Sequence, residues 1–310
     1  MRLPLLCLFA AFLLGSAHAA EPFFQKNDII ALVGGEDMVV ASEYGYLETL
    51  LARALPDYHL RFRSLAWEGD TVYEQRRDLN FPTWEEQLDK IGATVVICQF
   101  GQMESLDGKG KLPEFSAAYQ KLIERLSGGG KRRIAVITPH ETEPHPDEGT
   151  LFKTPLRDDS GAYSEAIADL TKSANFPCLR FSLHIKPEVQ KTRDGLHLDR
   201  AGQFVLAANF RGLLTPSRTT IDFDFEGGRF RNPEEVHLAS LIVAKNKLWF
   251  DYWRVQNWAF LAGDRTNQPS SRDWRDPSKR WFPAEREEFI PLIEAKEKEI
   301  DALAARLAGK

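Results

Sequence analysis

The sequence predicts an α/β fold in which helices cover both faces of one mainly parallel, five-stranded sheet. The first observation is that five short apolar runs alternate with segments of helical spacing, the order typical of parallel strands joined by crossover helices. The second is that these runs have the length of strands and are bounded by glycine, proline or polar residues. The third is the length of 310 residues, which is ample for one large core with an appended region.

The predicted elements can be placed in chain order. We expect strands at residues 28–33, 60–67, 94–100, 133–138 and 178–183. We expect helices at residues 44–55, 83–91, 112–126, 163–173 and 200–214. Pro56 ends the first helix, Thr83 offers an N-cap to the second, and glycines from Gly128 onward end the third. In such sheets, binding sites form at the carboxyl ends of the strands.

The amino-terminal stretch has the pattern of a signal peptide. Arg2 supplies a positive charge, residues 3–14 form an apolar run too short to cross a bilayer, and Ala17-His18-Ala19 has the small-x-small pattern of a cleavage site. We therefore expect residues 1–20 to be removed and the mature protein to be exported, either to the periplasm or out of the cell.

Charge and composition exclude several classes of partner. The net charge of −5 argues against a general nucleic-acid binder, which would carry a basic surplus. No later apolar run is long enough for a membrane span. Gly128-Gly129-Gly130-Lys131 follows a helix and lacks phosphate-loop spacing, so it is interpreted as a helix stop. We therefore expect no nucleic-acid partner.

A metal centre is the weaker interpretation of a second polar cluster. Its members follow the fourth predicted strand and carry ligating side chains: His140, Glu141, Glu143 and His145. The prolines between them indicate an irregular rim loop instead. We expect no metal and no cofactor.

One short block carries acid–base chemistry. Asp194 stands three residues before His197, and a predicted helix follows. That spacing lets the carboxylate fix the imidazole tautomer while the imidazole acts as a base. The plainer alternative is a loop histidine before a surface helix.

The order of the loops after the strands resembles the SGNH, or GDSL, hydrolase superfamily over roughly residues 28–214. The blocks that carry the resemblance are Leu32-Val33-Gly34-Gly35-Glu36, Trp67-Glu68-Gly69-Asp70-Thr71, Phe100-Gly101-Gln102-Met103 and Asp194-Gly195-Leu196-His197-Leu198. The resemblance implies a flavodoxin-like three-layer sandwich and esterase or lipase activity. It also implies a serine after the first strand and an oxyanion hole of glycine and asparagine after the second and third.

The chain departs from the family pattern at two of these positions. Aligning Gly34 with the family glycine places Glu36 where the nucleophilic serine would stand. Aligning Gly101 with the glycine of GxND places Met103 where the oxyanion asparagine would stand. A thioether donates no hydrogen bond, and losing one such donor costs roughly a factor of 100 to 1,000 in rate.

Three interpretations remain. In the first, His197, oriented by Asp194 and assisted by Glu36, activates water against an ester, with the Gly69 N–H helping to hold the oxyanion. In the second, Ser42 or Ser105 replaces the nucleophile. In the third, the chain is a catalytically inactive relative that binds a carbohydrate or cell-envelope ligand. We favour a hydrolase of ester bonds in a small acyl or carbohydrate ester.

The composition changes after residue 215, so we divide the mature chain into a hydrolase-like domain, 21–215, and a tryptophan-rich helical extension, 216–310. The extension has an edge-strand pattern at 219–225 and helical patterns at 234–253 and 284–307. The last helix carries an apolar stripe that packs on the protein or on a second copy in a homo-oligomer: Ile293, Ile300, Leu303 and Leu307. Five tryptophans form either a sugar-stacking platform or, as we favour, the contact with the main domain: Trp249, Trp253, Trp258, Trp274 and Trp281.

Overall fold

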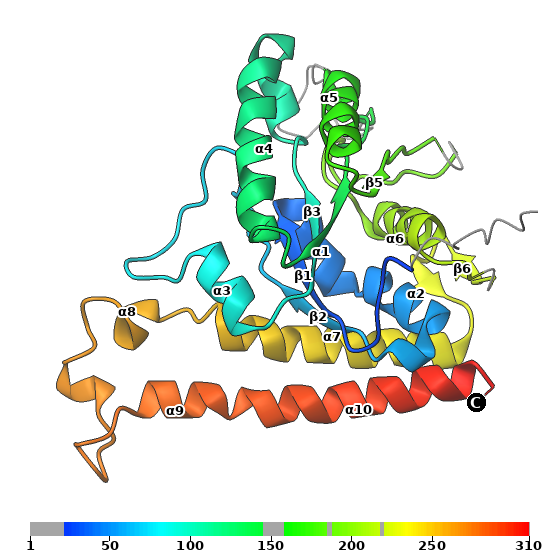
Figure 1. The fold of residues 1–310 in the computed structure, drawn as a ribbon. Coiled ribbons are helices and arrows are strands. Elements are labelled where there is room, and N and C mark those ends of the chain that lie inside the picture. The colour runs from blue at the N-terminus through cyan, green and yellow to red at the C-terminus, as the bar shows by residue number, and fades with distance from the viewer. Residues whose placement is uncertain (1–21, 145–157, 185–187, 218–219, 310) are drawn as a thin grey trace, which may run out of the picture.

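A parallel sheet forms the centre of the protein. The structure, a computed structural model, describes residues 22–144, 158–184, 188–217 and 220–309, so the predicted signal peptide lies outside the described residues. Five strands lie in the order β2-β1-β3-β4-β5, and each neighbouring pair is parallel (Figure 1). The strands are β1 Ile29–Gly34, β2 Arg61–Ser64, β3 Val95–Gln99, β4 Arg133–Ile137 and β5 Cys178–Leu179. The predicted α/β class and five-stranded parallel sheet are confirmed.

Helices cover both faces of this sheet. One face packs on α1 Glu36–Tyr44, α2 Tyr46–Ala54 and α6 Arg200–Leu214, and the other on α3 Trp84–Lys90, α4 Leu112–Ser127 and α5 Ser160–Ser173. The alternation of β3 shows why: Val95 and Ile97 join the first core, whereas Val96 and Cys98 join the second. The result is the three-layer sandwich that the resemblance implied.

Several predicted elements differ from those observed. The predicted helix 44–55 begins only at Tyr46, after a separate helix α1, because Gly45 adopts a left-handed φ of 67° between them. The predicted strand 178–183 contributes only two paired residues, β5. The predicted edge strand 219–225 shortens to β6 Phe223–Asp224, which pairs with β7 Arg229–Phe230 in a separate antiparallel hairpin.

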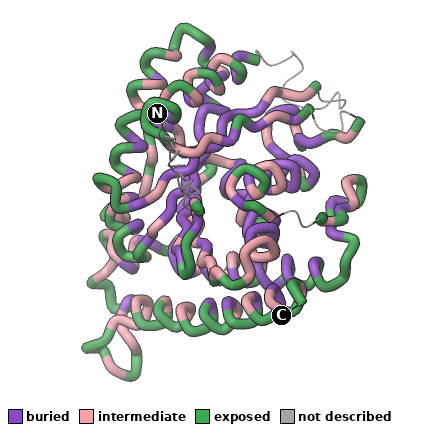
Figure 2. The backbone as a smooth tube through the Cα atoms, turned by 45° about the vertical axis from the view of Figure 1, so that its right-hand side comes forward, coloured by how far each residue is buried: buried purple, intermediate pink, exposed green. Residues whose placement is uncertain are grey.

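The C-terminal region packs along the outer strand of the sheet. Helix α7 Pro233–Trp253 covers β2, and the Trp249 Nε1–H donates to the carbonyl oxygen of Ser64 at 2.7 Å. Helix α10 Phe289–Leu307 lies against α7, with its outer side exposed (Figure 2). The remaining elements are short: η1 Pro56–Tyr58, η2 Glu104–Asp107, η3 Lys109–Lys111, α8 Trp258–Leu261, η4 Pro269–Ser271 and α9 Trp281–Glu287.

The predicted helix 284–307 is split, since α9 ends at Glu287 and α10 begins at Phe289. Its apolar stripe packs within the chain: Ile300 and Leu303 lie in one cluster with Leu238 and Ile242 of α7. Homo-oligomerisation stays a prediction. No helix among the described residues is both long and apolar enough to cross a bilayer.

Buried ion pairs fasten this region to the sheet. The Lys245 ammonium of α7 is fully buried and contacts Glu48 of α2 at 2.9 Å. Arg63 of β2 contacts Glu297 of α10 at 2.6 Å, and Arg61 contacts Asp301 at 2.7 Å. Buried charges must be paired to be tolerated, so these buried and partly buried contacts fix α7 against α2 and α10 against β2.

Candidate active site

A small hollow lies at the carboxyl ends of β1, β2 and β3. It is lined by residues from the three strand ends and from the loop before α6: Gly35, Glu36, Asp37, Asp70, Gln99, Phe100, Gln102, Met103, Glu104 and His197. Parallel strands bring their carboxyl ends to one edge of a sheet, which is where such folds place ligands. The hollow therefore brings Glu36, Met103 and His197 together from three distant parts of the sequence.

The turn after β1 depends on glycine. A Cβ added at Gly34 would lie 2.6 Å from the carbonyl oxygen of Gln99 and 2.7 Å from Cγ of Met38. No larger residue fits, so the chain can pass close to β3 and begin α1 at Glu36. The Glu36 carboxylate, which lies one-fifth exposed at this helix N-terminus, is ion-paired with Arg193.

The DxxH block forms a preorganised acid–base pair. The Asp194 Oδ1 accepts hydrogen bonds from the backbone N–H groups of Leu196 at 3.0 Å and His197 at 2.7 Å. Its Oδ2 lies 2.6 Å from Nδ1 of His197. Since a carboxylate only accepts hydrogen bonds, Nδ1 carries a proton, and in the neutral ring Nε2 keeps its lone pair. Among the described residues, Nε2 has no hydrogen-bond partner.

The environment keeps Asp194 charged. Its partial burial acts to raise its pKa, but the hydrogen bonds from the backbone and ring of His197, with that from Leu196, outweigh burial and lower the pKa below its ordinary value. Asp194 is therefore an anion at neutral pH and can stabilise a positive charge that forms on the imidazole.

A second histidine–aspartate pair, His140 and Asp37, holds the loop that carries His197 in place. His140 is fully buried, its Nε2 lies 3.2 Å from Oδ2 of Asp37, and its Nδ1 lies 2.8 Å from the carbonyl oxygen of Glu141. Both partners are acceptors, so both ring nitrogens donate and the ring is positively charged. The other oxygen of Asp37 accepts the backbone N–H of Leu198 at 2.9 Å. This pair thus ties the loop that carries His197 to α1 and to the end of β4.

Two opposing effects set the pKa of His140. Burial alone would lower it, but the hydrogen bond and charge of Asp37, with the Glu141 carbonyl, raise the pKa above its ordinary value. Sequence reasoning considered His140 only as a metal ligand. Its partner lies 103 positions away, and no local pattern reveals such a pair.

Two other members of the candidate metal cluster, Glu141 and Glu143, accept hydrogen bonds from backbone N–H groups of neighbouring loops. The Glu141 carboxylate accepts the backbone N–H of Leu183 at 3.0 Å, and the Glu143 carboxylate accepts that of Lys191 at 2.9 Å. His145 lies outside the described residues. Within the part of the chain that the structure describes, no group of three potential ligands could hold a metal ion.

The three predicted oxyanion residues, Gly69, Gly101 and Met103, lie in different environments. Met103 lines the hollow and is 41% exposed. Gly69 lies in an exposed turn and does not line it. The Gly101 N–H donates to the buried carboxylate of Glu104 at 2.8 Å, so it is not available to an oxyanion. Burial raises the pKa of Glu104, against the effect of the N–H donors from Val72 and Gly101.

Gln99 is a polar residue of the hollow that sequence reasoning missed. It ends β3, is 3% exposed, and lines the hollow. Neither its amide nitrogen nor its amide oxygen has a hydrogen-bond partner among the described residues. A buried polar group normally has one, so the hydrogen-bonding capacity of this amide is unused within the described part of the chain. The sequence contained one indication of this role: a single glutamine ends an otherwise apolar strand.

The two alternative nucleophiles do not meet His197 in this hollow. Ser105 is buried, and its hydroxyl donates to the carbonyl oxygen of Gln102 at 2.8 Å. Ser42 lies further along α1 and lines a different cavity.

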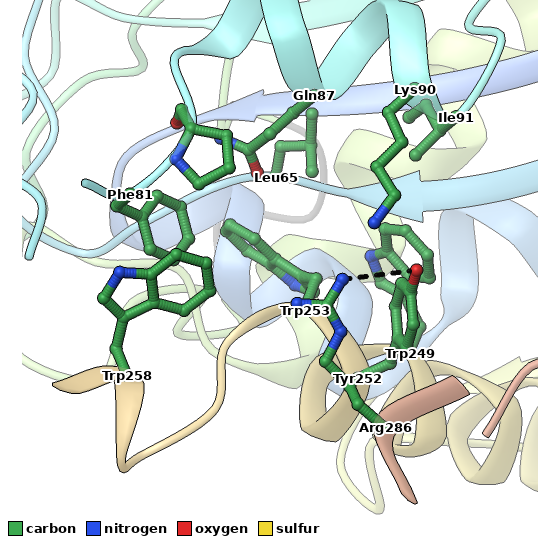
Figure 3. A pocket seen from close by; sticks show the side chains of 11 residues that line it. Leu65, Phe81, Gln87, Lys90, Ile91, Trp249, Tyr252, Trp253, Trp258 and Arg286 are labelled. Atoms are coloured by element: carbon green, nitrogen blue, oxygen red, sulfur yellow. Dashed lines mark hydrogen bonds between the residues drawn. The ribbon is translucent and has the colours of Figure 1, made fainter. Parts of the chain in front are cut away.

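Most of the C-terminal tryptophans join the core. Trp249, Trp253 and Trp258 are each at most 6% exposed and surround a small pocket between α7, α3 and the segment after α7 (Figure 3). In the same view, Arg286 reaches the hydroxyl of Tyr252. These three tryptophans therefore hold the extension on the main domain, as favoured from the sequence, whereas Trp274 is 87% exposed.

Comparisons with known proteins extend the fold assignment. No family model and no curated protein match the sequence. Among solved structures, BT4096, described as a gut microbial diltiazem-metabolizing enzyme, matches with 11% identity and a TM-score of 0.56, over 92% of this chain and 95% of its own. This match shows a shared fold that continues beyond residue 215.

Two shorter matches carry names from the superfamily that the sequence resembles. A candidate GDSL-like lipase from Parabacteroides merdae has 13% identity and a TM-score of 0.47, over 62% of this chain and 97% of its own. A candidate SGNH hydrolase from Slackia heliotrinireducens has 14% identity and a TM-score of 0.45, over 61% and 99%.

Proposed function

We propose that this protein is an exported hydrolase of the SGNH/GDSL type that cleaves the ester bond of a small acyl or carbohydrate ester. The observation that carries the proposal is the Asp194–His197 pair, whose free Nε2 belongs to a side chain that lines the hollow at the strand ends. An oriented imidazole with one free lone pair is the usual general base at neutral pH.

Water is the nucleophile in this proposal because Glu36 stands in place of serine. His197 Nε2 takes a proton from water, and the oxygen of that water forms a bond to the ester carbonyl carbon. The charge then moves to the carbonyl oxygen, and Asp194 stabilises the imidazolium. Collapse of this intermediate breaks the bond to the alkoxy oxygen, which takes the proton from His197. An acid and an alcohol leave. Glu36, held by Arg193, orients the water.

The Gln99 amide supplies the missing oxyanion donor. Its N–H group is buried and lacks a partner among the described residues, so no existing hydrogen bond has to break before it donates to a developing negative charge. This would replace the asparagine whose position Met103 occupies.

A binding protein without turnover is the second candidate. Two contacts favour it: Glu36 is already paired with Arg193, and the Gly101 N–H already donates to Glu104. Both groups would then shape a cleft for a carbohydrate or cell-envelope ligand.

Hydrolysis of p-nitrophenyl acetate and of acetylated sugars tests the proposal. We compare the wild type with His197→Ala, Glu36→Ser and the control His237→Ala, which changes an exposed histidine on α7. Removing the base should lower the rate by roughly 100- to 10,000-fold, and the control should have no effect. An inactive wild type with an active Glu36→Ser variant would favour the binding protein. Inactivity of all variants contradicts the catalytic assignment.

A further inference from the structure

A second, larger cavity lies beside the hollow, between α1, the end of β2 and α7. Its volume is about 300 Å³, which is at the lower end of the range of small-molecule sites. Its lining comes from three elements: Val39, Ser42 and Glu43 of α1, Ser64 and Ala66 at the end of β2, and Val243, Asn246, Lys247, Trp249, Phe250 and Trp253 of α7.

The walls of this cavity are mainly aromatic and apolar. Trp249 and Trp253 are otherwise buried, whereas Phe250 is 41% exposed. One polar atom is left over: the Ser42 hydroxyl oxygen is buried and has no hydrogen-bond partner among the described residues, although the Ser42 carbonyl accepts from Asn246 at 2.9 Å. A bound group that hydrogen-bonds this hydroxyl and covers the rings would remove two unfavourable free-energy terms: the unpaired buried hydroxyl and the exposed aromatic surface.

The cavity is within reach of the candidate active site. Helix α1 begins in the hollow at Glu36 and passes Val39 and Ser42 on the way out. Six residues of helix span about 9 Å. Ala66 likewise precedes the loop that brings Asp70 to the hollow. A molecule that extends about 9 Å from the hollow along α1 would therefore reach this cavity.

The charges at the rim disfavour an anion. Burial raises the pKa of Glu43, and the nearby carboxylates Glu36 and Glu68 raise it further, against the opposing effect of Arg193. The cation at the rim, Lys247, is already paired with Asp251 at 3.1 Å. A second negative charge would meet these carboxylates, and among the described residues that line the cavity no unpaired cation offsets it.

We propose that this cavity binds a neutral aromatic group, namely the aromatic part of a substrate whose ester bond lies at His197. The ring packs against Trp249, Phe250 and Trp253, and a polar substituent bonds the Ser42 hydroxyl. The link to the ester bond rests on the proposed function, but the aromatic site itself does not.

Binding of 2-naphthol, which is neutral at neutral pH, tests the site by calorimetric titration without any need for turnover. Its anionic analogue 2-naphthoate is measured beside it. Val243→Trp fills the cavity, and Val236→Trp, at a 43% exposed position of the same helix outside the cavity, is the matched control. Phe250→Ala removes a wall at a half-exposed position and serves if Val243→Trp fails to fold. Thermal unfolding verifies that each variant is folded.

We expect saturable binding of 2-naphthol by the wild type, by Val236→Trp and by His197→Ala, and at least tenfold weaker binding by Val243→Trp and Phe250→Ala. We also expect 2-naphthoate to bind at least tenfold more weakly than 2-naphthol. Absence of binding by the wild type, unchanged binding by the folded cavity variants, or equal binding of naphthoate overturns the proposal. Because His197→Ala tests binding alone, failure of the aromatic site is distinguished from failure of the hydrolase assignment.

Discussion

Replacing Gln99 with methionine should make the protein more stable and less active at once. Gln99 is 3% exposed, and the two polar atoms of its amide lack hydrogen-bond partners among the described residues. Leaving a buried polar group unpaired costs about 1–3 kcal/mol. Methionine has a similar length and flexibility but no group that needs a strong hydrogen bond. The folded state should therefore gain free energy when the amide is removed.

The size of both effects follows from this geometry. A gain of about 1–3 kcal/mol in the free energy of unfolding raises Tm by roughly 2–5 °C in a chain of this size. If Gln99 is the oxyanion donor, the same substitution lowers kcat for ester hydrolysis by roughly 100- to 1,000-fold. A residue with a purely structural hydrogen bond would change stability in the opposite direction.

Gln102→Met is the matched control. Gln102 is also buried and lines the same hollow, but its amide oxygen accepts the backbone N–H of His140 at 3.0 Å and its amide nitrogen lies 3.4 Å from the His140 carbonyl oxygen. Its loss should destabilise the protein. Thermal and urea unfolding give the stability, and hydrolysis of p-nitrophenyl acetate gives the rate. If Gln99→Met is destabilised like the control, or retains full activity, the assignment of Gln99 is refuted.

Two further predictions concern buried charges. Lys245→Ala leaves the Glu48 carboxylate buried without its partner and should cost about 3–5 kcal/mol in urea unfolding; the double variant Lys245→Met, Glu48→Leu should be much closer to the wild type, and equal losses would contradict a paired-charge role. Because the pKa of His140 is raised by folding, its contribution to stability is fully present below its ordinary value near 6.5 and is lost as pH rises through the folded-state pKa. His140→Gln should remove this decline from the pH dependence of the unfolding free energy, and an unchanged decline would show that another group causes it.

The sheet could be predicted because its signal is local. The run Val95-Val96-Ile97-Cys98 is apolar on both sides, as a strand buried between two helical layers must be. Helix α6 begins and ends where the pattern predicted, with Asp199 as its N-cap, because capping and periodicity coincide there. Helix α3 likewise begins after a capping box at Thr83 and Glu86.

Long-range contacts explain what the sequence did not reveal. Helix α1 was missed because it buries Asp37 together with four apolar residues and so shows little amphipathic pattern. Asp37 is buried only because His140 and the Leu198 N–H, both far along the chain, satisfy its carboxylate. The availability of the Gln99 amide and the loss of the Gly101 N–H to Glu104 are also properties of the packed site.

The C-terminal region helps to position the residues of the candidate active site. Helix α7 runs alongside β2 and donates two hydrogen bonds to its backbone. The Lys245 Nζ donates to the carbonyl oxygen of Phe62 at 3.3 Å, and the Trp249 Nε1–H donates to that of Ser64 at 2.7 Å. The next residue after α7, Arg254, bonds Glu68 at 2.7 Å and lies 3.8 Å from the centre of the Trp67 ring.

These contacts reach the hollow itself, since the carbonyl oxygens of Glu68 and Asp70 lie 3.7 and 3.3 Å from where a Cβ on Gly35 would stand. Helix α7 therefore fixes the loop after β2 against the start of α1 and also forms most of the aromatic wall of the second cavity. The change in composition near residue 215 marks a change of sequence pattern, but the contacts that shape the site cross it. A chain shortened at that point would lose the wall and the anchor of this loop together.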